Sequence, residues 1–296
     1  MDKKYDFMFS VIIPHYNQFK QLKVTLRYFE KQLFPQEHFE VIVINDGVSS
    51  KAEEILITQE YEINLKVVTI PHSGSGVARN EGAKIAQGQF LVFCDADRIP
   101  DVAFLNKYKE AIQKYKGEKY VFQGRVQECY AVDIFGSDEK TISRFSRDNQ
   151  YYKKIMNIYA HEKTISPICW ASFLVGNSCV PQKLFEHLGG FDPQYNVWGF
   201  EHFDLAIRMM EMDVCFINVC EAKNYHIPHS KSKEEYVRLF ENSAMIMNTK
   251  YPKYNRGFDY LVKYLCGEIS LQQFEVLFGG RSSFESIEIN DIYYKL

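Results

Sequence analysis

Four short apolar runs constrain the fold of this chain more than any other feature. They occupy residues 10–13, 40–44, 65–70 and 90–94. Each is rich in β-branched or aromatic residues and has the length of a buried strand. Apolar residues at helical spacing predict a helix over 18–33, and we predict another over 49–61. Because strands that alternate with helices pair in parallel through right-handed crossovers, the pattern predicts an α/β fold with a mostly parallel, mixed sheet flanked by helices.

The fourth run stops at two carboxylates, Asp95 and Asp97, one residue apart. In an extended chain residues two apart point the same way, so both side chains can face one ligand. Ligands of open α/β sheets bind beyond the carboxyl ends of the strands, and carboxylate oxygens suit a hard divalent cation. An acidic pair after a strand also caps helices and fills turns, so the motif alone does not separate these two interpretations.

Two further stretches carry candidate binding groups. A glycine-bearing loop at 74–77 leads into a helix predicted over 78–86, where Arg79 offers a planar cation for phosphates. The loop does not match Gly-x-Gly-x-x-Gly, which argues against a dinucleotide-dependent dehydrogenase. Farther along, Trp198 precedes Gly199, and an indole ring beside a glycine suits the apolar face of a sugar. Glu201 follows at the start of a predicted helix, a position that the helix macrodipole by itself favours for an acid.

The remainder of the chain is less informative. Residues 129–168 are polar, tyrosine-rich and poorly periodic, which is typical both of a loop over a site and of a surface insertion. His226 and His229 follow a strand predicted over 214–219 and are candidate metal ligands, although a single His-x-x-His is a weak signal. From residue 234 onward the pattern is helical. We therefore predict a domain over 1–230 and a C-terminal helical extension over 231–296, which we expect to serve packing, acceptor selection or homo-oligomerisation.

Composition excludes several classes of partner. The 296 residues carry a net charge of −3, which offers no basic field for nucleic acid or an anionic bilayer. The chain has seven cysteines, which is an odd number, and no Cys-x-x-Cys pair. This use of cysteine indicates a reducing compartment. We find no signal peptide and no run of the ~20 apolar residues that a transmembrane segment needs. The expected location is cytoplasmic. The protein would lie peripherally at the membrane if the molecule on which it acts is lipid-linked.

Six motifs, taken in order, resemble those of family 2 glycosyltransferases with the GT-A fold. They lie at residues 10–17, 44–47, 76–82, 95–97, 189–192 and 198–201. The resemblance covers about residues 9 to 230. It implies a nucleotide-sugar donor, usually a UDP-sugar, a Mn²⁺ or Mg²⁺ ion, and transfer with inversion of the anomeric centre.

The resemblance also assigns roles to individual residues. Those expected to bind the donor are Pro14, Tyr16, Asn17, Asp46, Arg79, Asp95, Ala96, Asp97 and Trp198, with Asp46 accepting hydrogen bonds from the base. Asp95 would face the ribose or the metal, and Asp97 would coordinate the ion that bridges the donor diphosphate. His226 or His229 would complete the metal site, and we favour His226 because it comes first after the strand.

The chain departs from the family at the catalytic base. Relatives usually read Trp-Gly-x-Glu-Asp, with the final Asp deprotonating the acceptor, and here His202 takes that position. Three interpretations stay open: Glu201 is the base, His202 is the base with an unperturbed pKa near ~6.5, or catalysis is lost. Asn45 and Val48 depart more mildly from the usual Asp-Asp-Gly-Ser.

The chain also lacks the Gln-x-x-Arg-Trp motif and the membrane spans of processive synthases, so we expect the transfer of a single sugar. The acceptor would be a glycan, a lipid carrier, a peptide or a small molecule. The competing hypotheses are a catalytically silent sugar-nucleotide-binding protein and a nucleotidyltransferase. The latter does not explain Trp198 and Gly199.

Overall fold

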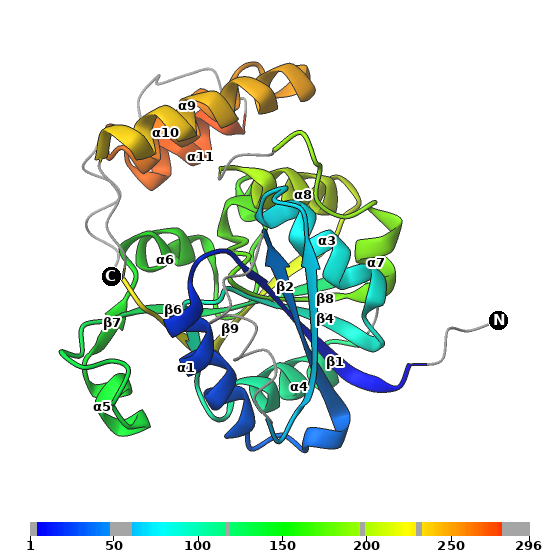
Figure 1. Ribbon diagram of the computed structural model, residues 1–296. Helices are drawn as coiled ribbons and strands as arrows, with labels where there is room; N and C mark the ends of the chain where they lie inside the picture. The colour runs from blue at the N-terminus through cyan, green and yellow to red at the C-terminus, as the bar shows by residue number, and fades with distance from the viewer. Residues whose placement is uncertain (1–4, 48–60, 117–118, 196–198, 229–232, 280–296) are drawn as a thin grey trace.

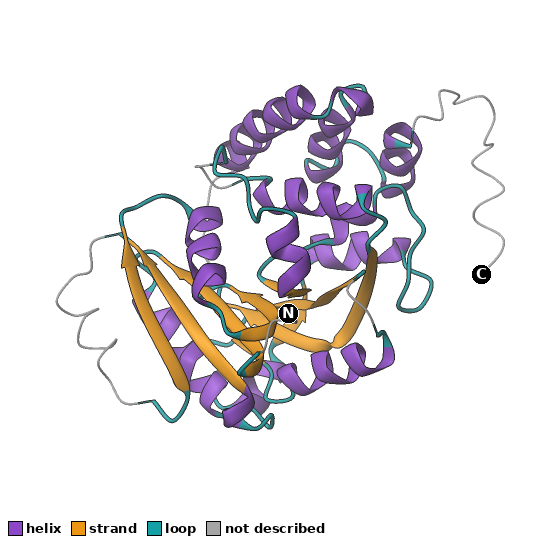
Figure 2. Cartoon of the chain, turned by 90° about the vertical axis from the view of Figure 1, so that its right-hand side faces the viewer, coloured by secondary structure: helices purple, strands orange, loops and turns teal. Residues whose placement is uncertain are grey.

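The computed structural model describes residues 5–47, 61–116, 119–195, 199–228 and 233–279. Within them nine strands form one mixed sheet with helices on both faces (Figures 1 and 2). Along the sheet the order is β3-β2-β1-β4-β8-β6-β9-β5, and β7 pairs with β6 at the side. The predicted α/β architecture is confirmed. The helix expected over 49–61 lies almost entirely outside the described residues.

The first half of the sheet is parallel, as the alternation of strands and helices predicts. Its strands are β3 (Asn64–Ile70), β2 (Phe39–Asp46), β1 (Phe7–His15) and β4 (Gly88–Cys94). The helices that follow β1 and β3 are α1 (Phe19–Glu30) and α3 (Ser75–Ile85). Because these strands run the same way, β1, β2 and β4 all end at one edge of the sheet.

The second half of the sheet contains the antiparallel pairs of the predicted mixed sheet, at positions that the sequence did not identify. Its strands are β8 (Asn177–Pro181), β6 (Tyr120–Cys129), β9 (Cys215–His226), β5 (Arg98–Pro100) and β7 (Ser146–Asp148). Strand β8 runs antiparallel to β4 and β6, and β5 runs antiparallel to β9. Strand β9 is longer than the predicted 214–219 and carries His226 as its last residue. Pairing with β6 and β5 extends it through polar residues that show no strand pattern of their own.

Two apolar cores lie on opposite faces of the sheet because side chains alternate along each strand. Val11 and Ile13 of β1 pack with α1 and α4 (Phe104–Lys114), whereas Ile12 faces the core of α3, α7 (Gln182–His187) and α8 (Glu201–Glu211). The 129–168 region is folded and contains α5 (Glu139–Arg144), β7 and α6 (Gln150–Ile155). Single turns of 3₁₀ helix occur at Gln36–His38, Met156–Ile158, Cys169–Ser172 and Pro252–Tyr254.

The described residues 233–279 are mainly helical, as the pattern predicts, while the division into two domains at residue 230 stays a prediction. Helices α9 (Lys233–Lys250), α10 (Gly257–Leu265) and α11 (Leu271–Phe278) lie together beyond α8 (Figure 1). Their aromatic side chains surround the fully buried Trp170, whose ring lies 5.5 Å from that of Phe258 and 5.1 Å from that of Phe278. In the part of the chain that the structure describes, no helix is both long and apolar enough to span a bilayer.

Candidate active site

Polar side chains gather where β1, β2 and β4 end. Asp46 is the last residue of β2, and Asp95 and Asp97 come directly after β4. The carboxyl ends of neighbouring parallel strands are where α/β sheets bind ligands. The structure therefore brings together residues from three of the six sequence motifs at this edge, and the helices α3 and α8 add the Arg79 and Glu201 motifs.

The end of β1 supplies an exposed aromatic surface. The Tyr16 ring is 50% exposed and stacks on His72, with 4.3 Å between ring centroids and 21° between their planes. A Cβ at Gly47 would lie 3.1 Å from the Tyr16 ring, so glycine there leaves room for the ring. Pro14 is buried at the end of β1, and Asn17 is exposed with a left-handed φ of 54°. A flat, exposed stack of this kind suits a nucleobase.

Asp46 anchors the loop that leads into α3. Its two carboxylate oxygens accept hydrogen bonds from the backbone N–H groups of Ser73 (2.6 Å) and Gly74 (2.9 Å). The side chain is almost fully buried. Asp46 thus connects the stacked rings of Tyr16 and His72 to the N-terminus of α3. The loop before α3 is the one that the sequence predicts to approach phosphates.

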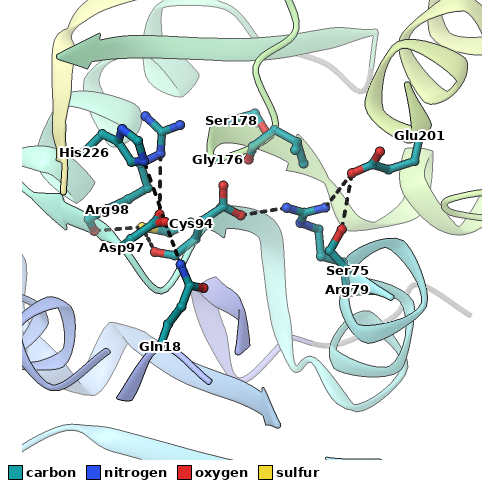
Figure 3. Close-up of polar contacts among 12 residues, drawn as sticks. Gln18, Ser75, Arg79, Cys94, Asp97, Arg98, Gly176, Ser178, Glu201 and His226 are labelled. Carbon is teal, nitrogen blue, oxygen red and sulfur yellow. Dashed lines mark hydrogen bonds and ion pairs between the residues drawn. The ribbon is translucent and has the colours of Figure 1, made fainter. Parts of the chain in front are cut away.

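Arg79 is the electrostatic centre of the site. Its Nη2 donates to Asp95 Oδ1 at 2.6 Å and its Nη1 to Glu201 Oε1 at 3.3 Å (Figure 3). Burial, the largest effect, lowers the pKa of Arg79, but the two carboxylates outweigh it and the net shift is upward. A guanidinium presents several N–H groups in one plane, which is why one side chain can bridge two acids.

Glu201 and His202 lie at the first turn of α8 in different electrostatic states. Burial raises the pKa of Glu201, and Arg79 offsets part of that rise. Glu201 also accepts hydrogen bonds from the hydroxyl of Ser75 (3.3 Å) and the backbone N–H of Gly199 (3.2 Å). Burial and then Arg79 lower the pKa of His202 to about 3, so its imidazole is neutral and weakly basic at neutral pH. The unperturbed value expected from the sequence does not apply in this environment.

Asp97 lies on the side of the 95–97 segment that faces away from Arg79 (Figure 3). The Gln18 amide donates to its Oδ2 at 2.8 Å, and His226 Nε2 is 3.7 Å from the same oxygen (Figure 3). Arg98 pairs with His226 in the β5–β9 ladder, which brings the two segments together. On its other nitrogen, His226 Nδ1 lies 2.6 Å from Glu128 Oε2. Burial and Arg98 lower the pKa of His226, but hydrogen bonds with Asp97 and Glu128 outweigh them and raise it.

The donor atoms near Asp97 fit a divalent cation only in part. Among the described residues, no group of three or more His, Cys, Asp and Glu side chains could hold a metal ion. Asp97 and His226 nevertheless present a carboxylate and an imidazole to one point. Metal sites of phosphate-transferring proteins commonly use one or two protein ligands and take further oxygens from water and substrate phosphates. The pair therefore fits a metal that binds together with a diphosphate. His229 lies outside the described residues.

Several contacting residues were not predicted from the sequence. Gln18, His72 and Glu128 each contact a predicted site residue, and no motif marks them. Gly176 lies so close to Asp95 that a Cβ there would overlap Oδ2 of the carboxylate. Ala96, expected at the donor, is fully buried between the two acids. Trp198 falls in the gap in the described residues, so its sugar-binding role stays a prediction.

Comparison with protein families supports the class that the fold and site suggest. Residues 10–173 match the family described as glycosyl transferase family 2, and residues 159–230 match the N-terminal domain of galactosyltransferase. The first match covers more than half of the chain. The protein belongs to glycosyl transferase family 2, and the predicted family, fold and enzyme class are confirmed.

The curated relatives are distant. Validoxylamine A glucosyltransferase of Streptomyces hygroscopicus subsp. jinggangensis is 25% identical over 259 residues, which cover 81% of this chain and 59% of that protein. The poly(ribitol-phosphate) beta-N-acetylglucosaminyltransferase TarS of Staphylococcus aureus is 37% identical over 91 residues, 30% of this chain and 16% of TarS. The chain covers less than two thirds of the length of these relatives.

Solved structures agree on the fold. The S. aureus TarS 1–349 complex with UDP-GlcNAc superposes with a TM-score of 0.60 at 18% identity, covering 82% of this chain and 67% of that one. GalNAc-T7 with UDP, GalNAc and Mn²⁺ superposes with a TM-score of 0.56 at 19% identity, covering 76% and 44%. These structures share the GT-A fold.

Proposed function

We propose that this chain is an inverting, metal-dependent glycosyltransferase that moves one sugar from a UDP-sugar to an acceptor hydroxyl. The observation that carries the proposal is the bridge made by Arg79 between Asp95 and Glu201. It connects the acidic motif at the donor side of the sheet to the helix that bears the candidate base. Two structural neighbours with this fold were solved with UDP or a UDP-sugar, which supports the choice of donor.

Different residues would bind the nucleoside, bind the metal ion and remove the acceptor proton. Tyr16 and Asp46 would hold the nucleoside, with Asp46 fixing the loop before α3. Asp97 and His226 would hold the divalent ion, which when bound would neutralise the charge that builds on the departing UDP. Glu201 would remove the proton from the acceptor hydroxyl. Its raised pKa makes it a stronger base than an exposed carboxylate, whereas His202 with a pKa of about 3 is a poor base.

The alternative of a silent binding protein also has a specific observation in its favour. Glu201 is ion-paired with Arg79, and a carboxylate held by a cation is less free to take a proton. Donor hydrolysis separates the two functions, because a silent protein binds UDP-sugars without releasing UDP.

The first test is donor binding. A panel of UDP-sugars with Mn²⁺ should raise the melting temperature, because a ligand at a hundredfold excess over its Kd adds about 2.7 kcal/mol to the free energy of unfolding. Asp97→Asn should abolish the Mn²⁺-dependent part of the shift. Asp213→Asn, at an exposed turn after α8, is the matched control and should leave it unchanged. UDP release from the donor that binds is the second measurement. Absence of any shift, or an Asp97→Asn variant that behaves as wild type, contradicts the proposal.

A further inference from the structure

Glu128 is a partly buried carboxylate that none of the family motifs includes, and it contacts a candidate metal ligand. Its Oε2 lies 2.6 Å from His226 Nδ1, while the opposite ring nitrogen, Nε2, faces Asp97 at 3.7 Å. An ionised carboxylate can only accept a hydrogen bond, so Nδ1 must carry the proton in this contact. Metal-binding histidines commonly donate their second ring N–H to a carboxylate in this way.

A break in the β6–β9 ladder creates this pair. Gly124 lies opposite Val219, but the next residue, Arg125, lies opposite Lys223, so that residues 220–222 of β9 are passed over. An unbroken ladder would place Lys223 opposite Glu128, whereas the observed register places His226 there. Irregularities of this kind often re-aim a side chain beside an active site.

Packing around the break fixes the shifted register. A Cβ at Gly124 would collide with the Asn177 side chain and with the backbone carbonyl of Ala222. The amide of Asn177 donates to the carbonyls of Arg125 (2.9 Å) and Ala222 (3.0 Å), so it satisfies backbone groups on both strands. Tyr108, from α4, donates to Asn177 Oδ1 at 2.6 Å. The register that aligns Glu128 with His226 is therefore held from three elements.

Asn149 fixes the other end of Glu128. Its Nδ2 donates to Glu128 Oε1 at 2.6 Å. Its Oδ1 is occupied as the N-cap of α6, where it accepts from the N–H groups of Tyr151 (2.9 Å) and Tyr152 (3.2 Å). The Asn149 amide cannot turn over without losing the cap. Glu128 thus has one oxygen committed to an N–H donor and the other directed at His226.

We propose that Glu128 is a positioning residue that holds the proton of His226 on Nδ1, so that Nε2 is directed, together with Asp97, at the divalent cation. This inference rests on the metal-dependent function proposed above. Glu128 acts through His226 and does not contact the ion.

The substitution Glu128→Gln tests this idea with almost no change of shape. Asn149 still donates to the remaining oxygen of the new amide, which leaves the amide NH₂ facing His226 Nδ1. That group can only donate, so the ring proton moves to Nε2, and a protonated Nε2 cannot bind a metal. Glu221→Gln is the matched control because Glu221 is exposed on β9 itself.

Mn²⁺ binding in the presence of UDP, followed by electron paramagnetic resonance or calorimetry, is the principal measurement. Glu128→Gln should weaken Mn²⁺ binding by about 10–100-fold, the usual cost of losing the partner of a metal-binding histidine. Glu221→Gln should have no effect. In a His226→Asn background Glu128→Gln should cost nothing further, because the ring through which Glu128 acts is gone. If the loss persists in that background, Glu128 acts as a ligand or by its charge, and the proposal is wrong.

A second measurement does not depend on the metal. The ¹⁵N signals of His226 in the metal-free protein, recorded where the ring is neutral, should show the proton on Nδ1 in the wild type and on Nε2 in Glu128→Gln. An unchanged tautomer overturns the positioning role. If wild type shows the expected tautomer but binds no Mn²⁺ with UDP, the metal-dependent function fails and with it the direction of His226 at an ion, while the hydrogen-bond assignment stands.

Discussion

Arg79 and Arg98 lie on the two sides of the acidic segment and have unlike surroundings (Figure 3). Arg79 is 4% exposed and donates to two carboxylates, at 2.6 and 3.3 Å. Arg98 is 18% exposed, its Nε is 4.0 Å from Asp97, and neither Nε nor Nη1 has a hydrogen-bond partner in the structure. On the Arg79 side both terminal nitrogens of the guanidinium are ion-paired and only Nε lacks a partner, whereas on the Arg98 side both Nε and Nη1 lack an acceptor.

Asp95 and Asp97 also differ in the charge of their nearest partner. Asp95 is neutralised by a full charge at 2.6 Å, while the short contact of Asp97 is to the neutral amide of Gln18. A carboxylate paired with a guanidinium has less negative charge to offer a cation than one held by an amide. The comparison teaches that the two positions of one Asp-x-Asp motif have different electrostatic surroundings, which agrees with the proposal that Asp97 rather than Asp95 binds the ion.

The largest effect is expected at Glu201, the far end of the Arg79 network. Glu201→Gln should lower turnover by about 10²–10⁴-fold, the usual contribution of a general base. His202→Asn should change turnover little, because a ring with a pKa of about 3 accepts protons poorly. Steady-state sugar transfer measures both. Near-normal turnover in Glu201→Gln would assign the Arg79 network to structure alone.

The pH dependence of turnover separates the same two residues. A base must be unprotonated, so turnover falls as the pH decreases through its pKa. Burial places the pKa of Glu201 above 4.5, so we expect the acidic limb above that value. A limb near pH 3 would instead match His202.

The second effect concerns stability. Arg79→Met leaves the buried Glu201 and the partly buried Asp95 without their cation and should lower the free energy of unfolding by about 3–5 kcal/mol. Arg98→Met is the control, since its guanidinium makes only a long ion pair, and should change it by less than about 1 kcal/mol. Urea denaturation of both variants makes the measurement. Equal losses of unfolding free energy in the two variants would show that Arg79 and Arg98 stabilise the fold to the same extent.

A smaller loss is expected from Gly176→Ala. The added methyl group overlaps Asp95 Oδ2, so the carboxylate must shift from the position in which it accepts from Arg79, at a cost of about 1–3 kcal/mol. Gly189→Ala is the control: no atom lies within 4 Å of its added Cβ, and only its φ of +76° opposes the substitution. We expect UDP affinity to fall in the first variant and to stay constant in the second. Unchanged affinity in both would show that the position of Asp95 does not matter for the nucleotide.

The smallest effect tests the Asp97 side. Gln18→Ala removes one hydrogen bond and should cost about 0.5–1.5 kcal/mol of unfolding free energy. Gln89→Ala, at an exposed position of β4, should cost less. A loss from Gln18→Ala as large as that from Arg79→Met would mean that Asp97 is as firmly structural as Asp95.

The sequence predicted the parallel half of the fold well, because each of its strands is short and rich in β-branched or aromatic residues. It did not reveal β5, whose three residues include a proline and have no periodicity, nor the polar end of β9. Both exist because they pair with each other, and pairing between distant segments leaves no local pattern. The antiparallel insertion of β8 went unpredicted for the same reason.

The candidate site likewise contains residues that the sequence identified and residues that it did not. Asp95, Asp97, Arg79 and Glu201 could be named from motifs, and the structure brings them together, while their roles stay predictions. Glu128 could not be named, since it contacts His226 only through a register shift set by tertiary packing. The low pKa of His202 likewise follows from burial, which no residue type specifies by itself.

The strand order also sets the sequence of events during synthesis. Strands β1 to β4 pair among themselves, so the nucleotide side of the site can form while the ribosome is still adding the second half of the chain. Among the described strands β5 pairs only with β9, so Asp97 cannot meet His226 until β9 has emerged from the exit tunnel. A nascent chain arrested before β9 therefore carries the paired strands β1 to β4, with Asp46 and Asp95 at their ends, but lacks the imidazole of His226.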